Sequence, residues 1–144
     1  MNVRKSPHCS YRIRYHMVFV LKYRKDLISE ELFEFMKLIC KGIQKRFYLR
    51  FDAIGSDGDH LHIVVEGAPK YSPSQIMQIC KSVLARMIFK QFPKIKEELW
   101  GGEFWSDGGH IDTIGDGRGL DEVKKYVETQ GGDINQLKLY KFVD

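Results

Sequence analysis

Two histidines, His60 and His62, are separated by one residue within the stretch 59–66. This stretch alternates polar and apolar residues, which is the pattern of a β-strand with one apolar face. Successive strand side chains point to opposite faces, so both imidazoles share one face. At a rise of about 3.3 Å per residue, their Cα atoms lie roughly 6.5–7 Å apart. The spacing suits one shared metal ion or phosphate, and it is equally typical of polar residues on a solvated strand.

A second pair of polar residues, Tyr126 and Gln130, lies in a segment with helical periodicity, 120–130. The apolar stripe of this segment consists of Leu120, Val123 and Val127. Residues four apart share a helix face, and the tyrosine and glutamine lie on a face clear of that stripe.

Basic residues concentrate in the first 50 residues, which hold 12 Lys or Arg and 4 Asp or Glu, whereas the remaining residues hold 11 and 15. This asymmetry suggests a surface that faces a polyanion, although charge runs are often only solvated faces. The cluster 22–25 also contains an aromatic residue, a combination that suits phosphate contact with base stacking. The candidate nucleic-acid contacts are Arg12, Arg14, Lys22, Arg24 and Lys25.

The elements that must position these residues follow from periodicity and capping signals. We expect strands at 11–21, 49–56, 59–66 and 110–114, helices at 29–47, 72–92 and 120–130, and a final short helix from 133 to 140 or 142. This order predicts an α+β fold with a ferredoxin-like or RRM-like antiparallel sheet, helices packed on one face, and a C-terminal helix that bears the tyrosine. The other face would be free for ligands and would carry Arg12, Arg14, His60 and His62.

The chain has the length of one domain, 1–144, which we divide into a sheet-and-helix core (1–114), a glycine-rich tether (115–119) and a catalytic helix with its tail (120–144). Residues 1–10 are expected to be a mobile basic lead-in. The three cysteines lack the spacing of a disulfide scaffold or zinc site, which favours a reducing cytoplasm. No apolar run approaches ~18 residues, so no membrane association is expected.

Taken in order, the motifs of this chain resemble one family. The motifs are Tyr15–Phe19 with Lys22–Arg24, His60-Leu61-His62, the segment Leu99–Gly108, and Tyr126 with Gln130. They resemble the single-tyrosine HUH transposases of small bacterial and archaeal insertion sequences, over nearly the whole chain as far as Gln130. One departure is His110, where relatives are expected to carry an aromatic residue.

The resemblance implies a DNA transposase that cuts single-stranded DNA at insertion-sequence ends and rejoins it through a 5′-phosphotyrosine link. It implies Tyr126 as the nucleophile, and His60, His62 and Gln130 as ligands of Mg²⁺ or Mn²⁺. It also implies recognition of DNA hairpins at the element's ends. The family forms homodimers in which the tyrosine helix of one subunit completes the site of the other, and the flexible stretch Gly115–Gly119 would permit this exchange.

Other functions are compatible with parts of the pattern. A non-catalytic module that binds hairpins or RNA on the same fold would stack bases on aromatic residues of its central strands, but the corresponding positions of 59–66 are not aromatic. A nucleotide hydrolase with a His-x-His-x-His motif fails at Val64. An inactive relative kept for regulation would be expected to lose His60, His62, Tyr126 or Gln130. Replication initiators and relaxases share the chemistry but usually have longer chains.

Overall fold

The computed structural model describes residues 3–115, 119–129 and 137–142. The strands are β1 (Arg4–Ser6), β2 (Cys9–Tyr11), β3 (Arg14–Val20), β4 (Arg50–Ser56), β5 (His60–Glu66), β6 (His110–Thr113) and β7 (Lys138–Lys141). The helices are α1 (Glu30–Arg46), α2 (Pro73–Gln91), α3 (Pro93–Glu98) and α4 (Gly119–Thr129), with a 3-10 turn η1 (Lys22–Arg24). Within these residues, five strands form an antiparallel sheet in the order β6-β3-β5-β4-β7.

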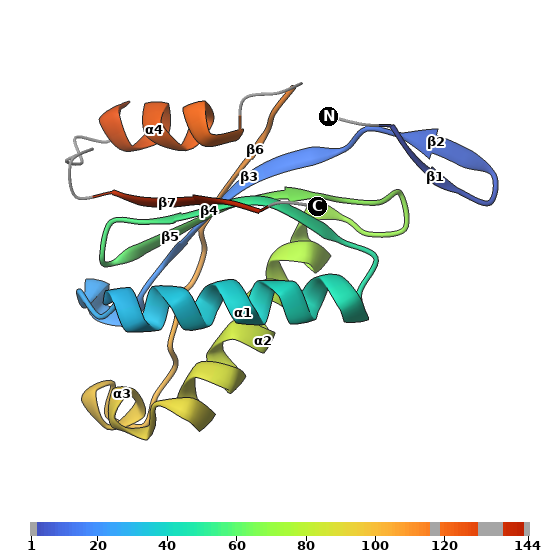
Figure 1. The fold of residues 1–144 in the computed structure, drawn as a ribbon. Coiled ribbons are helices and arrows are strands. Elements are labelled where there is room, and N and C mark those ends of the chain that lie inside the picture. The colour runs from blue at the N-terminus through green and yellow to red at the C-terminus, as the bar shows by residue number, and fades with distance from the viewer. Residues whose placement is uncertain (1–2, 116–118, 130–136, 143–144) are drawn as a thin grey trace.

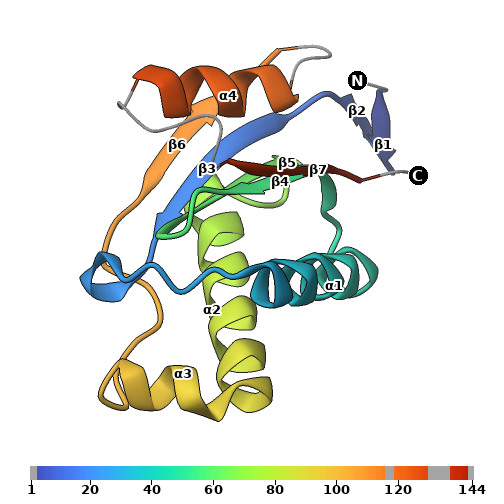
Figure 2. The ribbon, with the colours of Figure 1, turned by 60° about the vertical axis from the view of Figure 1, so that its left-hand side comes forward.

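The first four strands of this order reproduce the ferredoxin-like arrangement that the sequence predicted. The helices α1 and α2 cross beneath one face of the sheet, while α4 lies on the opposite face (Figure 1, Figure 2). Both long helices begin as expected: Ser29 Oγ accepts from the N–H of Leu32, and Ser72 forms a capping box with Gln75. The predicted α+β fold is confirmed.

The central strand β5 is buried on both faces of the sheet. Its apolar residues Leu61, Ile63 and Val65 join the main core beneath α1 and α2. On the opposite face, Val64 packs in a smaller apolar cluster with Val123 of α4. The expectation that this face is free for ligands is therefore wrong in part, because the apolar stripe of α4 needs a surface to bury against.

Both ends of the chain differ from the sequence expectation. Residues 1–10 were expected to be mobile, but β1 and β2 pair as a hairpin, and Tyr48 donates to the carbonyl of Lys5 at 2.8 Å. The final short helix was also wrong, because residues 138–141 form β7 along β4. Apolar side chains there alternate between the two faces, Leu139 toward α4 and Tyr140 toward the main core. The exposed edge of β4 supplies the hydrogen-bond partners that favour a strand.

The division of the chain into core, tether and catalytic helix stays a prediction. Most of the expected tether (116–118) and the segment after α4 (130–136) lie outside the described residues, and Gln130 is among them. In the part of the chain that the structure describes, no helix is both long and apolar enough to cross a membrane.

The turn between β4 and β5 depends on Gly58, whose φ of +104° is a conformation that L side chains rarely adopt. An added Cβ would also overlap a carboxylate oxygen of Asp26. The Asp-Gly turn predicted at 57–58 is thus held in a backbone geometry that glycine alone adopts without strain.

We expect Gly58→Ala to lower the free energy of unfolding by roughly 1–3 kcal/mol, because the alanine must occupy a disfavoured region of φ/ψ space. Gly42→Ala is the matched control: Gly42 lies within α1, and its added Cβ would meet nothing within 4 Å. This control should raise the stability by roughly 0.5–1 kcal/mol, since alanine favours the helix. Urea denaturation followed by circular dichroism measures both, and a stabilised Gly58→Ala protein would contradict the assignment.

Candidate active site

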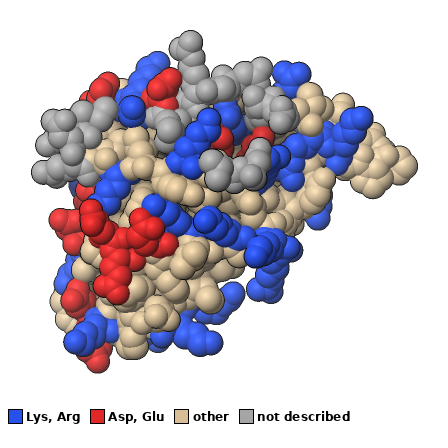
Figure 3. Space-filling model, in the orientation of Figure 1, with Lys and Arg blue, Asp and Glu red and all other residues tan. Residues whose placement is uncertain are grey.

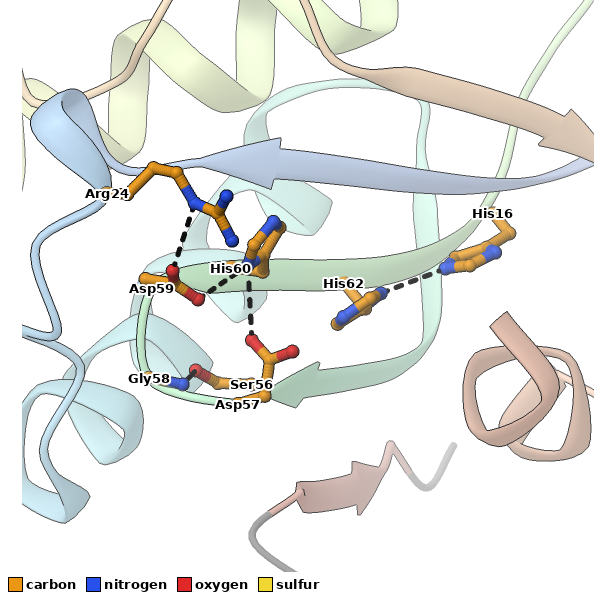
Figure 4. Close-up of polar contacts among 8 residues, drawn as sticks. All are labelled: His16, Arg24, Ser56, Asp57, Gly58, Asp59, His60 and His62. Carbon is orange, nitrogen blue, oxygen red and sulfur yellow. Dashed lines mark hydrogen bonds and ion pairs between the residues drawn. The ribbon is translucent and has the colours of Figure 1, made fainter. Parts of the chain in front are cut away.

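The candidate site lies where β5 begins, at the β4–β5 turn. The carbonyl of Asp59 accepts a hydrogen bond from the N–H of Leu21 at 3.0 Å, and the N–H of Gly58 donates to Ser56 Oγ at 3.1 Å. These bonds tie the turn to the end of β3 and hold the start of β5 in place. Figure 4 shows His60 and His62 projecting from the same side of β5, as their spacing predicted.

His60 is half-buried and contacts two carboxylates. Its Nδ1 lies 2.6 Å from Asp59 Oδ1 and 3.5 Å from Asp57 Oδ1. The hydrogen bonds with Asp57 and Asp59 raise the pKa of His60, against the opposing effect of burial. A proton on Nδ1 satisfies the carboxylates and leaves Nε2 with a lone pair for a ligand.

His62 is almost completely buried and pairs with a residue that the sequence did not single out, His16 of β3. The Nδ1 atom of His62 lies 3.2 Å from Nε2 of His16, while Nε2 of His62 is buried and has no hydrogen-bond partner. If His62 Nδ1–H donates to His16, the buried Nε2 of His62 carries a lone pair. In Figure 4 the His62 ring lies between His16 and the Asp57 carboxylate.

Tyr126 lies on α4 directly over these histidines. Its ring centroid is 5.3 Å from that of His16, 5.7 Å from that of His62 and 5.0 Å from that of His110. Val123 and Val127 are buried against the sheet and fix this face of α4. The helix and the strand that the sequence singled out separately are thus brought together within one chain.

The phenol of Tyr126 is not activated by its protein surroundings alone. Burial raises its pKa, and the nearby carboxylates of Asp112 and Asp57 raise it further. The proton therefore stays on the hydroxyl at neutral pH. His110, whose Nε2 lies 2.7 Å from Asp112 Oδ2, packs on the same ring and fills the place where relatives were expected to carry an aromatic residue.

A metal ion at this site would find oxygen and nitrogen ligands. Asp57, Asp59 and His60 each offer a ligand atom, and these atoms lie within 4.8 Å of one another. The sequence pointed to His60, His62 and Gln130 and did not single out the two aspartates, although Asp57 belongs to the predicted Asp-Gly turn and Asp59 follows it. The position of Gln130 lies outside the described residues, so its role as a ligand stays a prediction.

The five cationic candidates do not share one environment. Arg14 is buried, with Nη1 3.1 Å from Asp52 Oδ2 and Nη2 donating to the carbonyl of Gly115 at 2.6 Å. Its guanidinium therefore joins β4 to the end of β6, and the expectation that Arg14 is available to a nucleic acid is not met in this structure. Arg12, Lys22, Arg24 and Lys25 remain at or near the surface.

The charged side chains of α1 are divided between its two ends. Figure 3 shows acidic side chains gathered over one end of this helix and basic side chains toward its other end. The first turn contains Glu30 and Glu31, and the last turn contains Lys45 and Arg46. α1 holds four Lys or Arg and three Glu, so this helix accounts for little of the predicted charge asymmetry.

Comparison with known proteins gives one consistent result. The sequence model of the family described as "Transposase IS200 like" matches residues 9–130. The ISDra2 transposase TnpA of Deinococcus radiodurans is 26% identical over 130 residues, which cover 90% of this chain and 92% of that protein. The transposase for insertion sequence element IS200 of Salmonella typhimurium is 28% identical over 123 residues, covering 85% and 80% of the two chains.

Two solved structures have the same fold. A crystal structure from Deinococcus radiodurans, described as that of a transposase, superposes with a TM-score of 0.72 at 24% identity and covers 90% of this chain and 99% of that chain. The REP-associated tyrosine transposase bound to a REP hairpin superposes with a TM-score of 0.54 at 10% identity, covering 88% and 75%.

The buried histidine pair predicts how the metal-free protein responds to acid. Burial lowers the pKa of His62 to about 3 and that of His16 to about 4. Both pKa values lie below the ordinary value of the unfolded chain, so their contribution to stability is present above pH ~6.5 and is lost as the pH falls toward 4. The raised pKa of His60 acts oppositely: its contribution is present below pH ~6.5 and is lost as the pH rises through the folded-state pKa.

Histidine NMR titration in the presence of EDTA measures these values directly. We expect His16 and His62 to remain neutral at pH 5, and His60 to titrate above its ordinary value. Urea unfolding at several pH values should show the free energy of unfolding decreasing between pH 6.5 and 4.5. Titration of His62 near pH 6.5 would show that its ring is solvated rather than enclosed by α4.

Proposed function

This chain belongs to the family of IS200-like transposases, and from that premise we propose that it cleaves and rejoins single-stranded DNA at insertion-sequence ends, with Tyr126 as the nucleophile. The observation that carries the proposal is the position of the phenol, whose ring lies 5.7 Å from that of His62 between centroids. The sequence pattern pointed to no other tyrosine as a partner of these histidines. A nucleophile and a group of potential metal ligands therefore meet on one face of the sheet.

The proposed reaction is a transesterification at a DNA phosphodiester. The Oη atom of Tyr126 loses its proton and bonds to phosphorus, while the bond from phosphorus to the 3′ oxygen breaks and that oxygen takes up a proton. The products are a 5′-phosphotyrosine link and a free 3′-OH. Because the link preserves a phosphodiester, the reverse attack by a 3′-OH rejoins strands without ATP.

The residues present fit a divalent cation. His62 Nε2 is buried without a hydrogen-bond partner, and the buried Asp57 Oδ1 makes a long ion-pair contact of 3.5 Å with His60 Nδ1. Imidazole nitrogen with carboxylate oxygen suits Mn²⁺ and is compatible with Mg²⁺. We propose that His60 and His62 hold the ion with Gln130, and that Asp57 is available as a further ligand. A bound ion would polarise the scissile phosphate and stabilise its developing negative charge.

His16 is proposed to be the positioning residue for this site. By accepting the Nδ1–H of His62, it directs the lone pair of Nε2 toward the ion and fixes the orientation of the ring. Its own ring edge also contacts Tyr126. One side chain of β3 thus orients a metal ligand and packs against the nucleophile.

DNA hairpins are the proposed substrates, since a structural relative is a tyrosine transposase bound to a REP hairpin. We further propose a homodimer in which α4 can act in the site of either subunit. In this chain α4 packs on its own sheet, through Val123 and Val127. After exchange, α4 would make the same apolar contacts with the sheet of the partner subunit. The exchange would therefore change which chain supplies Tyr126 and leave the composition of the site unchanged.

Tyr126→Phe should abolish covalent attachment to single-stranded hairpin DNA in the presence of Mg²⁺, lowering the rate at least about a thousandfold, because the attacking oxygen is absent. Hairpin binding should be retained, since the phenyl ring keeps its packing. A denaturing gel detects the adduct, and Lys124→Ala, an exposed change on the same helix, is the control. An equal yield of adduct from Tyr126→Phe would eliminate this tyrosine as the nucleophile. Hairpin binding without any adduct, in the wild type as in the variants, would favour a non-catalytic binding module.

Mixing subunits locates the site in which the tyrosine acts. Tyr126→Phe and His62→Ala subunits, each inactive alone, should form adducts when mixed if the helix acts on the partner, because one site of each mixed dimer is then complete. Lack of activity in verified mixed dimers would show that each tyrosine acts within its own chain.

His62→Ala should weaken Mn²⁺ binding by more than about 100-fold, and His16→Ala by about 10- to 100-fold, as expected for a ligand and for the residue that orients it. His16→Gln should recover part of the affinity, because its amide oxygen can accept the Nδ1–H of His62. Titration followed by electron paramagnetic resonance measures the affinities without DNA. His8→Ala, an exposed histidine between β1 and β2, is the control; unchanged binding by His62→Ala would remove His62 from the ligands.

A further inference from the structure

An exposed pair of aromatic rings lies beside the candidate active site. Tyr23 and Trp100 expose 59% and 72% of their surface, and their ring centroids are 5.1 Å apart at an interplanar angle of 82°. An edge-to-face pair leaves a broad face of at least one ring uncovered by the other. Burial in the core does not explain two large rings held together in solvent.

The backbone around this pair is held in an unusual conformation. Tyr23, Arg24 and Trp100 have φ values of +59°, +51° and +54°, and they are the non-glycine residues with positive φ in the described part of the chain. Left-handed backbone is unfavourable for L residues and persists where surrounding contacts impose it. Here the N–H of Lys22 donates to the carbonyl of Phe104 at 2.9 Å. The two segments that carry the rings are therefore fixed to each other.

Three cations lie around the rings, and one of them reaches the residue before His60. Lys25 Nζ lies 4.7 Å from the Trp100 ring centroid and donates to the carbonyl of Glu98 at 3.1 Å. Lys22 Nζ lies 5.8 Å from the Tyr23 ring centroid and 3.7 Å from Glu103 Oε2. Arg24, whose side chain is 74% exposed, places Nε 3.4 Å from Asp59 Oδ2, next to His60. The turn that carries Tyr23 is thus linked through Arg24 to an acidic residue of the candidate site.

We infer that Tyr23 and Trp100 form a stacking platform for unpaired bases of the DNA strand that enters the active site. This inference rests on the proposed cleavage of single-stranded DNA and names the residues that hold the strand beside the scissile phosphate. Rigid exposed rings among lysines and arginines are the features by which proteins hold single strands, because every base offers a π-face and every nucleotide a phosphate.

Single-stranded DNA fits this surface better than a protein partner does. The apolar area is limited to two rings, whereas protein interfaces require a larger apolar centre shielded from charge. Three cations lie around the rings, and their charge suits a polyanion better than an apolar face. A double helix is disfavoured as well, since its bases are stacked on one another and unavailable to the rings.

Binding can be separated from cleavage by using Tyr126→Phe as the background for every variant. Trp100→Gly removes the ring while suiting the positive φ, so the loop is expected to remain folded. We expect it to weaken binding of a single-stranded oligonucleotide about tenfold, with Trp100→Phe close to the parent because a π-face remains. Leu38→Ala, a 62% exposed residue on α1, is the control and should leave the affinity unchanged.

Salt dependence and fluorescence distinguish stacking from charge. Trp100→Gly should leave the slope of log K against log salt unchanged, whereas Lys25→Gln should reduce it by about 0.7, the value for one phosphate contact to a single strand. The chain has two tryptophans, and Trp105 is buried with Nε1 donating to Lys81. Quenching of tryptophan fluorescence by the oligonucleotide should therefore disappear in Trp100→Phe.

Three outcomes would overturn the inference. Equal affinity of Trp100→Gly and its parent would show that the ring does not stack on DNA. If Trp100→Gly weakened the binding of single- and double-stranded oligonucleotides equally, the effect would be one of general electrostatics. A dimer that dissociates in Trp100→Gly without DNA, seen by sedimentation, would make the rings a contact between subunits. If instead the wild type forms no covalent adduct but Trp100-dependent binding persists, the cleavage proposal fails while the platform stands.

Discussion

The hydrogen bond between His16 and His62 is the contact on which the second face of the sheet depends. Both rings are removed from water, so each nitrogen must find a partner or carry a cost of desolvation. The bond satisfies one nitrogen of His62 and leaves the other, Nε2, without a partner. Packing alone would favour an apolar residue at this position. A bound ligand that accepted the lone pair of His62 Nε2 would supply the missing interaction beneath α4.

The side chains of β5 alternate between the two faces of the sheet, and the two faces have different roles. The odd-numbered residues of β5 fill the core against α1 and α2, where they stabilise the fold by burial. The even-numbered residues begin with His60 and His62 and continue into an apolar contact at Val64, which holds α4. Because α4 is anchored by its valines, Tyr126 is carried to the histidines without any direct bond to them. The position of Tyr126, the proposed nucleophile, is thus set by hydrophobic packing.

Local patterns predicted the local parts of this arrangement. Alternation identified the histidine strand, helical spacing placed Tyr126 on a separate face from the valines, and capping signals located both long helices. His16 and Asp57 were missed because their roles depend on which strands are neighbours and in which register, and periodicity within one strand carries no such information. The segment 138–141 was predicted to be helical from local signals alone. That prediction failed because the pairing of this segment with β4 is a long-range contact, which overrides local propensity.

The same carboxylates have opposite effects on the two halves of the proposed site. Asp57 raises the pKa of His60 by hydrogen bonding, and together with Asp112 it raises the pKa of Tyr126. The negative charge that keeps the phenol protonated is also the charge that favours a cation among His60, His62 and Asp57. A bound cation would balance this charge and would place a positive centre beside the half-buried phenol. Under the function proposed above, activation of Tyr126 is tied to occupation of the metal site, and a tyrosine placed over the histidines would not react until the ion binds.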